Sequence, residues 1–303
     1  MELAVEIAGL QPETLKLTTE WVQHAEKLGC TMAFAAEAWW SDAVTPLAYL
    51  ADKTEKIQLA TGIMQVTART PAMTAMTALT LHDLTNGRFV LGLGASGPQV
   101  VEGLHGTKYN PALTRLKETV DICRMIFRGE KVEYQGKIFQ LPMPNSEGKA
   151  IRIAHKPTDI PIYLATLGPN SLEYTGEVAN GWMGTSFSPD HPEAHFDFLK
   201  RGAEKANRSL EDLNLCVSTR IEIGDDVEVM IEKRKPAVAF NMGGMGSGTT
   251  NFYNDAFKRA GYEEDAIAIQ SLWLAGEREQ AAKRVPDAMV TEFQALGTRE
   301  MIA

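Results

Sequence analysis

Three glycines follow a strand-like apolar run in the stretch RFVLGLGASGPQ, and their spacing could serve a cofactor. Gly92, Gly94 and Gly97 match G-x-G-x-x-G, which binds the pyrophosphate of a dinucleotide in Rossmann folds. That chemistry also needs a helix that opens at the third glycine, followed by a second strand. Instead, Pro98 follows Gly97, and residues 110–128 have a helical pattern. The context argues against a dinucleotide site. Two interpretations of the glycines remain: they let a flat ligand approach the backbone closely, or they form a tight turn that binds no ligand.

Two carboxylates lie near the ends of the first two predicted strands. Glu6 lies near the carboxyl end of the apolar run 3–9, and Glu37 ends the run 32–37. A carboxylate inside a barrel is costly unless it has a partner or a function. We therefore expect Glu6 to be an acid–base or substrate-orienting group. The alternative is a carboxylate that is hydrogen-bonded to a neighbour in the barrel.

The histidines and cysteines do not form a metal-binding pattern. His191 and His195 stand four residues apart in HPEAH, but no acidic or cysteine pattern surrounds them, so we expect both at solvent-facing helix positions. The three cysteines, Cys30, Cys123 and Cys216, match no metal spacing and indicate buried thiols in a reducing compartment. The sequence therefore predicts no metal site.

Apolar runs that alternate with helical patterns must position these residues. Most of the runs lack a clean polar–apolar alternation, as expected for parallel strands that are covered on both faces. Strand–helix–strand recurrence predicts a parallel sheet with right-handed crossovers. The predicted strands span residues 3–9, 32–37, 57–64, 88–95, 160–167, 181–187 and 213–223.

Two helices can be predicted with a defined apolar face. The stretch PETLKLTTEWVQHAEKLG places Trp21, Ala25 and Leu28 on one stripe and ends at Gly29. The stretch NPALTRLKETVDICRMIFRGE has apolar residues at alternating spacings of three and four, which is typical of a helix. These residues are Leu113, Leu116, Val120, Cys123 and Phe127.

Two stretches interrupt the strand–helix rhythm of what we predict to be a single domain, residues 1–303. Residues 131–157 contain VEYQGKIFQLP, which predicts a small hairpin that turns at Gln135–Gly136 and is followed by a loop. Residues 225–296 are too long for one crossover and include NMGGMGSGT, which we interpret as a mobile loop. We treat both stretches as insertions.

Composition restricts the partners. The formal charge of −9 argues against nucleic acid and anionic membrane surfaces. No apolar run approaches the length of a membrane span, and the N-terminus lacks the basic region of a secretion signal. The sequence predicts a cytoplasmic protein that handles a small molecule.

The segment LATGIMQVTARTPAMTAMTALTLHDLTNGRFVLGLGASGPQVVEGLHG resembles the core of the luciferase-like monooxygenase superfamily. It is more similar to the coenzyme F420-dependent oxidoreductases of that superfamily, including the methylenetetrahydromethanopterin reductases. The segments AAEAWWSDAVTPLAYLADKTEKIQLATG and PIYLATLGPNSLEYTGEVANGW extend the resemblance over nearly all of residues 1–223. The resemblance implies a TIM-type (β/α)8 barrel with its site at the carboxyl ends of the strands. Only seven strands can be counted by residue 223. The eighth strand is therefore missing, shortened or supplied from within residues 225–296.

The resemblance also implies a cofactor site. It places a non-prolyl cis peptide at Gly62–Ile63, beside Thr61, against the cofactor ring, where a side chain added to Gly62 would intrude. The alternative is an ordinary strand end with a glycine bulge. Glu37 matches an acidic position that lines the cofactor pocket, and Glu6 matches a glutamate of the methylenetetrahydromethanopterin reductases. The other implied cofactor residues are Gly94, Ala95, Ser96, Ala165, Leu167, Gly168, Pro169 and Asn170.

The segment LGPNSLEYTGE is implied to hold the phosphate-bearing tail of the cofactor. A helix that starts near Pro169 would turn free N–H groups and the positive end of its dipole toward an anion. The alternative is simple capping of this helix by Asn170 or Ser171.

The chain departs from the glucose-6-phosphate dehydrogenases of the superfamily at two positions. Ala38 stands where they have a histidine, and Gly97 stands where they have a glutamate in the glycine loop. Sugar-phosphate oxidation through those groups is therefore not expected.

The resemblance implies an oxidoreductase that transfers a hydride between reduced F420 and a small organic substrate, with a homodimer as the expected assembly. A deazaflavin already carries the hydride chemistry, so the protein would supply binding, orientation and electrostatics. The alternatives are an FMN-dependent luciferase-like monooxygenase and a flavin-binding protein without catalysis.

Overall fold

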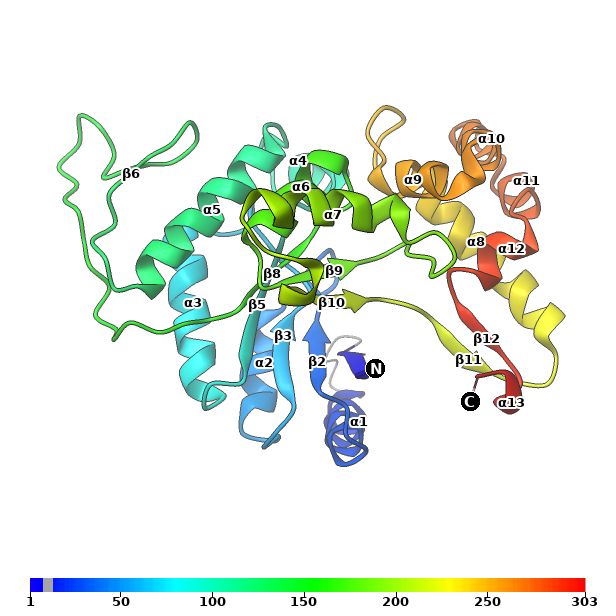
Figure 1. The fold of residues 1–303 in the computed structure, drawn as a ribbon, viewed down its shortest axis with the longest axis horizontal. Helices are drawn as coiled ribbons and strands as arrows, with labels where there is room; N and C mark the ends of the chain where they lie inside the picture. Colours follow the sequence, from blue (N-terminus) through cyan, green and yellow to red (C-terminus); the bar gives the residue numbers. More distant parts are fainter. Residues whose placement is uncertain (8–12, 303) are drawn as a thin grey trace. The chain divides into compact units, whose positions relative to one another are not determined.

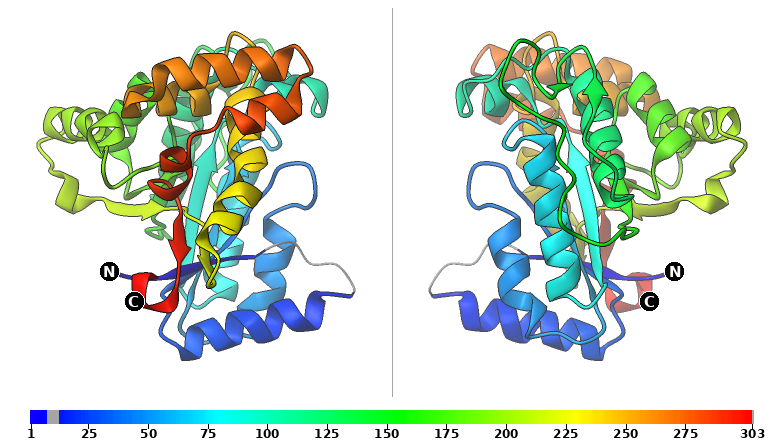
Figure 2. Two further views of the ribbon diagram at one scale, coloured as in Figure 1. Left: turned by 90° about the vertical axis from the view of Figure 1, so that its right-hand side faces the viewer. Right: turned by 90° about the vertical axis from the view of Figure 1, so that its left-hand side faces the viewer.

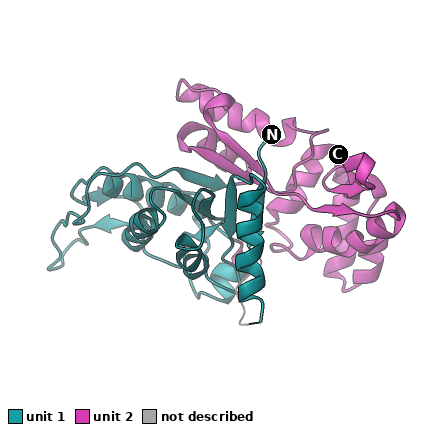
Figure 3. Ribbon diagram, turned by 90° about the horizontal axis from the view of Figure 1, so that it is seen from below, with its two compact units in different colours: residues 1–96, 100–165 teal, residues 97–99, 166–303 magenta. Residues whose placement is uncertain are grey.

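The computed structural model describes residues 1–7 and 13–302. The chain divides into two compact units (Figure 3). Unit 1 comprises Met1–Ser96 and Val100–Ala165, and unit 2 comprises Gly97–Gln99 and Thr166–Ala303.

Unit 1 is built on a parallel sheet with the strand order β1-β2-β3-β5-β8, and β4 extends β3 along β5 (Figure 1). The sequence prediction of these strands is confirmed, although each is shorter than predicted, and residues 8 and 9 of the first one lie outside the described residues. The strands are β1 (Ala4–Ile7), β2 (Met32–Ala35), β3 (Gln58–Thr61), β4 (Met64–Gln65), β5 (Phe89–Gly94) and β8 (Ile162–Ala165).

Helices connect these strands, and α2, α3 and α5 pack side by side (Figure 2). Pro71 at the first turn and the Thr70 hydroxyl, which accepts from the Met73 N–H, set the start of α3. The helices up to the hairpin are α1 (Leu15–Lys27), α2 (Val44–Ala51), α3 (Pro71–Leu84), α4 (Pro98–Gly103) and α5 (Ala112–Phe127).

The predicted apolar faces hold for α5 but not for α1. In α5 the side chains of Leu116, Val120, Cys123 and Phe127 are buried, while Leu113 is partly exposed. In α1 the buried residues are Val22 and Ala25, whereas Trp21 and Leu28 are exposed. A helix with apolar residues on two adjoining stripes can turn either one inward, and the smaller side chains face the protein here.

The ladder between β3 and β5 is interrupted by one extra residue. Ala60 pairs with Val90, and pairing resumes at Met64 with Leu93, so three residues face two across the gap. Such a bulge bends a strand and often lies beside an active site. It therefore accounts for the split of the predicted strand 57–64 into β3 and β4.

The stretch 131–157 contains the predicted hairpin, formed by β6 (Tyr134–Gln135) and β7 (Gln140–Leu141), but its turn spans residues 136–139 and not Gln135–Gly136, because Gln135 pairs with Gln140 in the ladder. Its turn closes around the carboxylate of Glu118 from α5, which accepts hydrogen bonds from three backbone N–H groups. The donors are Lys137 at 2.7 Å, Ile138 at 3.0 Å and Phe139 at 2.8 Å.

Unit 2 contains two separate parallel strand pairs. The predicted strand 213–223 breaks into β10 (Asn214–Val217), which pairs with β9 (Gly181–Gly184), and β11 (Ile221–Ile223). The last strand, β12 (Ala295–Gly297), pairs with β11. A shortened final strand is therefore present, and it begins just within the stretch 225–296.

Two helices of unit 2, α6 (Pro169–Val178) and α7 (Glu193–Lys205), pack backbone to backbone. A Cβ at Gly202 would collide with the carbonyl of Glu173, and one at Gly176 would collide with the carbonyl of Leu199. Only glycine allows this approach.

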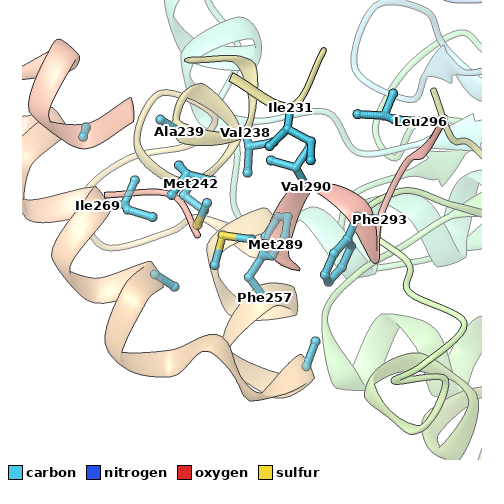
Figure 4. Packing of buried hydrophobic residues seen from close by; sticks show 14 of the residues in the cluster. Ile231, Val238, Ala239, Met242, Phe257, Ile269, Met289, Val290, Phe293 and Leu296 are labelled. Carbon is cyan, nitrogen blue, oxygen red and sulfur yellow. The ribbon is translucent and has the colours of Figure 1, made fainter. Parts of the chain in front are cut away.

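The stretch 225–296 is mostly helical rather than a long irregular insertion. Its helices enclose an apolar core centred on Met242, Phe257 and Met289 (Figure 4). Only Gly244–Asn251 of the glycine-rich segment lies between helices, and Asn251 donates to the Met242 carbonyl at its end. The elements are α8 (Val227–Gly243), α9 (Phe252–Phe257), a π-helical turn η2 (Lys258–Tyr262), α10 (Glu263–Leu274), α11 (Arg278–Lys283) and α12 (Asp287–Thr291). The 3-10 turn η1 (Leu210–Asp212) precedes β10, and α13 (Arg299–Ile302) follows β12.

None of the helices in residues 1–7 and 13–302 is both long and apolar enough to cross a membrane.

Candidate functional site

Four of the predicted site residues share one face of the sheet of unit 1. Glu6 pairs with Phe34, Phe34 pairs with Ala60, and the strand alternation then places Gly62 on the same face. Across the sheet, Gly94 pairs with Ala165, and the alternation of β5 places both on this face as well. At the carboxyl ends of three strands, the face therefore has glycine or alanine where other positions of the sheet have large aliphatic side chains.

The predicted cis peptide at Gly62–Ile63 is present. The Ile63 side chain lies over Gly94, because a Cβ built at Gly94 would come within 3.1 Å of Ile63 Cδ1 and 3.6 Å of Ala165 Cβ. The absence of a side chain at Gly94 thus makes room for the Ile63 side chain, which forms the surface of this part of the face.

The expectation for Gly62 needs correction. A Cβ there would lie 3.0 Å from Cβ and Cδ1 of Phe34, so it would meet the neighbouring strand first. A substitution at Gly62 would therefore disturb packing within the sheet as well as any ligand on this face.

Thr61 is fully buried, and its hydroxyl fills the gap that the bulge leaves in the ladder. The hydroxyl donates to the Gly92 carbonyl at 2.8 Å and accepts from the Gly92 N–H at 2.8 Å. This side chain satisfies the backbone of β5 rather than presenting its oxygen to a ligand.

Glu37 forms an ion pair that fixes the end of β2. Both of its carboxylate oxygens lie 2.7 Å from Nη1 of Arg69, and they also accept from the backbone N–H groups of Gln65 and Ala43. Its side chain is only 8% exposed. A charge-assisted pair with this many backbone bonds is rigid, so Glu37 holds the loop beside the bulge in place.

Glu6 differs from the expectation of a buried carboxylate in a barrel, because it is exposed. It still occupies the face that carries Phe34 and Gly62, so a ligand on that face could contact it. Its role as an acid–base group stays a prediction.

The segment after β5 contains the next predicted residues. Ala95 and Ser96 are partly buried, and Ser96 has a positive φ of 61°. A Cβ at Gly97 would have only Gln99 Oε1 near it, at 3.4 Å. The third glycine of the motif therefore has room for a side chain, in contrast to Gly94.

In unit 2, the residues Leu167–Asn170 form the start of α6, with Gly168 at the N-cap and Pro169 in the first turn. No side chain caps this end, and Ser171 instead donates its hydroxyl to the Gly168 carbonyl at 2.8 Å. The alternative of capping by Asn170 or Ser171 is therefore wrong. Asn170 is exposed, and the positive end of the helix dipole at this uncapped start remains suited to an anion.

Arg259 from the π-helical turn fixes the segment before α6. Its Nη2 donates to the Leu167 carbonyl at 2.7 Å, and its Nε donates to the Ala194 carbonyl at 3.0 Å. Burial lowers the pKa of Arg259, and Asp255 partly opposes this shift. An arginine keeps its charge under such conditions, so it brings a positive charge to the start of α6.

His195 contradicts the prediction of a solvent-facing helix residue. It is 1% exposed and packs against the Trp182 ring at 5.3 Å and the Phe187 ring at 6.0 Å. Neither ring nitrogen has a hydrogen-bond partner among the described residues. Burial, and then the charge of Arg259, lower the pKa of His195 to about 4, so the ring is neutral at pH 7.

The predictions for His191 and for the three cysteines agree only in part with the structure. His191 precedes α7 and lies 3.5 Å from carboxylate oxygens of Glu193 and Glu292, rather than at a free helix position. Cys123 is buried, and burial raises the pKa of its thiol to about 12, whereas Cys30 and Cys216 are only partly buried. In residues 1–7 and 13–302, no cluster of three or more His, Cys, Asp or Glu could hold a metal ion.

Sequence reasoning missed Arg69 and Arg259. Arg69 stands in ARTP between a strand and a helix, so a cation near the predicted acidic position was the available signal. Arg259 lies in a helical stretch remote from every motif, and no pattern in the sequence relates it to Leu167.

A parallel sheet with a bulged third strand and a small-residue face defines a class of barrel-type α/β protein. The sequence model of the luciferase-like monooxygenase family matches residues 3–303, and the chain therefore belongs to this family. Its fold is the TIM-type barrel of that family with a shortened final strand.

The relatives and solved structures narrow the assignment. The chain is 38% identical, over 92% of its length and 83% of the relative, to a protein of Mycobacterium tuberculosis named as a coenzyme F420-dependent oxidoreductase. It is 28% identical, over 83% of its length and 73% of the relative, to 5,10-methylenetetrahydromethanopterin reductase of Archaeoglobus fulgidus. Among solved structures, the F420-dependent tetrahydromethanopterin reductase of Methanopyrus kandleri matches with a TM-score of 0.78 and 25% identity, covering 99% of this chain and 87% of that chain. The chain thus belongs with the F420-dependent oxidoreductases of the family.

Proposed function

We propose that this protein transfers a hydride between coenzyme F420 and a small organic substrate. The observation that carries the proposal is the face at the carboxyl ends of β3, β5 and β8, where Gly62, Gly94 and Ala165 add little bulk and Ile63 lies on Gly94 as an apolar surface for a flat ring. The names of the relatives support F420 as the group that occupies it.

The residues present fit such a group. Gly94 and Ala165 form a cradle in which the Ile63 side chain lies, and Ile63 supplies an apolar surface for a flat ring. Taken by itself, the uncapped start of α6 in unit 2, with the charge of Arg259, suits an anionic group. When bound, F420 supplies a ring carbon that gives or accepts hydride.

The chain's own residues then have distinct tasks. Ile63 and Gly94 orient a ring against the sheet, and Glu37 with Arg69 holds the loop next to them in one conformation. Glu6 lies on the same face and can hold or move a proton at its carboxylate oxygens.

Titration with F420, followed by absorbance and fluorescence, tests the cofactor, with FMN as the competitor. We expect F420 to bind at least about tenfold more tightly than FMN, which corresponds to about 1.4 kcal/mol. Reduced F420 should then be oxidised under anaerobic conditions by at least one member of a panel of small carbonyl and unsaturated compounds. Preferential FMN binding would favour a monooxygenase, and F420 binding without turnover would favour a non-catalytic protein.

Two glycine variants locate the ring. Gly94→Val should weaken F420 binding by at least about tenfold, because the new side chain would displace Ile63 from its place on Gly94. Gly97→Ala is the matched control, since a Cβ at that position meets only the flexible Gln99 side chain. Equal losses in both variants, or no loss in Gly94→Val, would remove the ring from this face.

A further inference from the structure

Two adjacent tryptophans are exposed in the loop that follows β2 in unit 1. Trp39 is 55% exposed and Trp40 is 56% exposed. Their ring centroids lie 5.3 Å apart, and the ring planes stand at 86° to each other. Tryptophan is mostly buried in folded proteins, so two exposed neighbouring tryptophans indicate an interaction surface.

The loop that presents the two rings is held at both ends. On one side, Gln65 Nε2 donates to the Glu37 carbonyl at 3.0 Å, next to the ion pair of the Glu37 carboxylate. On the other side, Asp42 Oδ1 accepts from the N–H groups of Val44 at 2.9 Å and Thr45 at 2.7 Å, at the start of α2. A preorganised loop loses little conformational entropy when a ligand binds to it.

The loop also begins beside the small-residue face. The Glu37 N–H donates to the Ile63 carbonyl at 3.2 Å, so the residue two positions before Trp39 contacts the bulge directly. The two tryptophans therefore follow closely after a residue that contacts the bulge. They belong to unit 1, as does the face assigned to the cofactor ring.

We infer that Trp39 and Trp40 form a binding corner for the uncharged, planar, conjugated ring system of the substrate. This inference rests on the proposed oxidoreductase function. Two aromatic planes at right angles let a flat ring stack on one face while its edge meets the other, which are the two preferred aromatic geometries. A saturated, puckered ring can satisfy neither.

The charges around the corner exclude the main competing ligands. Arg69 is engaged by Glu37, and Asp42 adds a negative charge to the same loop two residues after Trp40, so an anionic group is disfavoured. A cation needs ring faces turned toward it from several sides. Here the edge of one tryptophan faces the other ring, which leaves a corner rather than a cage.

Equilibrium dialysis of the full-length protein with naphthalene-2-carboxamide tests the inference, and decahydronaphthalene-2-carboxamide is the saturated match. The planar amide should bind the parent at least about tenfold more tightly than the saturated one. Trp39→Ala and Trp40→Ala should each raise the Kd of the planar amide about tenfold, whereas the double variant with phenylalanine at both positions should retain most of the binding. Trp21→Ala, which removes a tryptophan of similar exposure from α1, should leave the Kd unchanged.

Several outcomes would overturn the inference. These are equal binding of the two amides, an equal loss in Trp21→Ala, or tighter binding of naphthalene-2-sulfonate or phenyltrimethylammonium than of the planar amide. A changed oligomeric state in the double alanine variant, measured by light scattering, together with unchanged amide binding, would assign the corner to a second copy of the chain. The dialysis is done without F420, and F420 binding by the same variants is measured separately. A failure of the proposed cofactor is thus distinguishable from a failure of the corner.

Discussion

The hydroxyl of Thr61 makes hydrogen bonds that the backbone of a neighbouring strand normally makes. At the bulge, β5 loses the regular partner for Gly92, and one side chain from β3 both accepts from its N–H and donates to its carbonyl. A buried backbone group that lacks a partner costs about 1–3 kcal/mol. This single oxygen therefore supports the geometry of Ile63 and Gly94 on which the cradle depends.

Thr61→Val should lower the free energy of unfolding by about 2–4 kcal/mol, because both groups of Gly92 would lose their partner in a nearly unchanged shape. It should also weaken F420 binding. Thr61→Ser keeps the hydroxyl and should lose only about 1 kcal/mol for the missing methyl group. Urea unfolding and F420 titration of the two variants provide the measurement. Similar losses in both would show that the methyl packing, and not the hydroxyl, matters here.

Glu6→Gln should reduce kcat by about 10²–10⁴-fold if the carboxylate transfers a proton, while the Kd of F420 stays within about twofold. Glutamine keeps the shape but cannot titrate. Glu2→Gln, an exposed neighbour at the N-terminus, is the control. Steady-state kinetics with a substrate from the panel and a parallel F420 titration provide the measurement. An unchanged kcat in Glu6→Gln would make Glu6 a surface residue of this face.

At single positions, the sequence predicts the backbone better than the contacts. The resemblance predicted the cis peptide at Gly62–Ile63, which is present, whereas the role of Glu37 beside the cofactor stays a prediction. It could not show that Thr61 bonds to Gly92 or that Arg69 pairs with Glu37, since these contacts depend on how separate strands align. The burial of His195 was equally hidden, because its neighbours Trp182 and Phe187 lie outside its own helix, in and after the preceding strand.

At the scale of elements, the hairpin β6–β7 depends on a residue outside it. The carboxylate of Glu118 in α5 accepts hydrogen bonds from three N–H groups of the turn. A Cβ at Gly136 would collide with this carboxylate. The hairpin was predictable from Gln135–Gly136, but its anchor was not. A turn with several parallel N–H groups is an anion-binding concavity, and here an internal carboxylate occupies it.

Glu118→Gln should release this hairpin, since the amide presents a donor where the turn needs an acceptor. We expect the amide protons of Lys137, Ile138 and Phe139 to exchange at least about tenfold faster, because at least one of these bonds is lost. Hydrogen exchange read by NMR provides the measurement. Glu133→Gln, at an exposed position before β6, should leave these rates unchanged. Unchanged protection in Glu118→Gln would mean that the strand pairing alone holds the turn.

Helix prediction failed in the stretch 225–296 for a physical reason. Pro236 lies inside α8, and a glycine-rich segment follows the helix, so local signals argue for irregular structure. Tertiary contacts override them: Asn254 donates to the carbonyls of Met242 and Ala266, and the apolar residues of five helices enclose one core. Such contacts join residues that are distant in sequence, and periodicity alone cannot reveal them.

At the scale of the whole molecule, the strand order follows from the sequence pattern, because consecutive apolar runs separated by helices leave few topologies. The shortened last strand was the uncertain element, and Ala295–Gly297 supplies it as the partner of β11. Stability at this scale depends on groups that titrate in the folded protein. Two histidines should act with opposite sign.

His195 should make the protein less stable as the pH falls. Its pKa is about 4 in the folded state because of burial and then Arg259, against about 6.5 when the chain is unfolded. Between pH 6.5 and about 4, the unfolded chain therefore binds a proton at His195 that the folded protein does not bind. The free energy of unfolding decreases by at most about 3 kcal/mol as the pH falls through this range. His195→Phe, which keeps a ring among Trp182 and Phe187, should remove this part of the slope.

His155 provides the internal comparison for this measurement. The backbone carbonyl of Lys156, and then Asp83 at 2.9 Å, raise the pKa of His155, so its contribution is present at low pH and is lost as the pH rises through the folded pKa. His155→Gln should therefore lower stability at pH 5 more than at pH 8, whereas His195→Phe should raise it at pH 5 relative to pH 8. Urea unfolding of the parent and both variants at pH 5 and pH 8 provides the measurement. If His195→Phe has the same pH dependence as the parent, the buried histidine is not the group that makes the fold sensitive to acid.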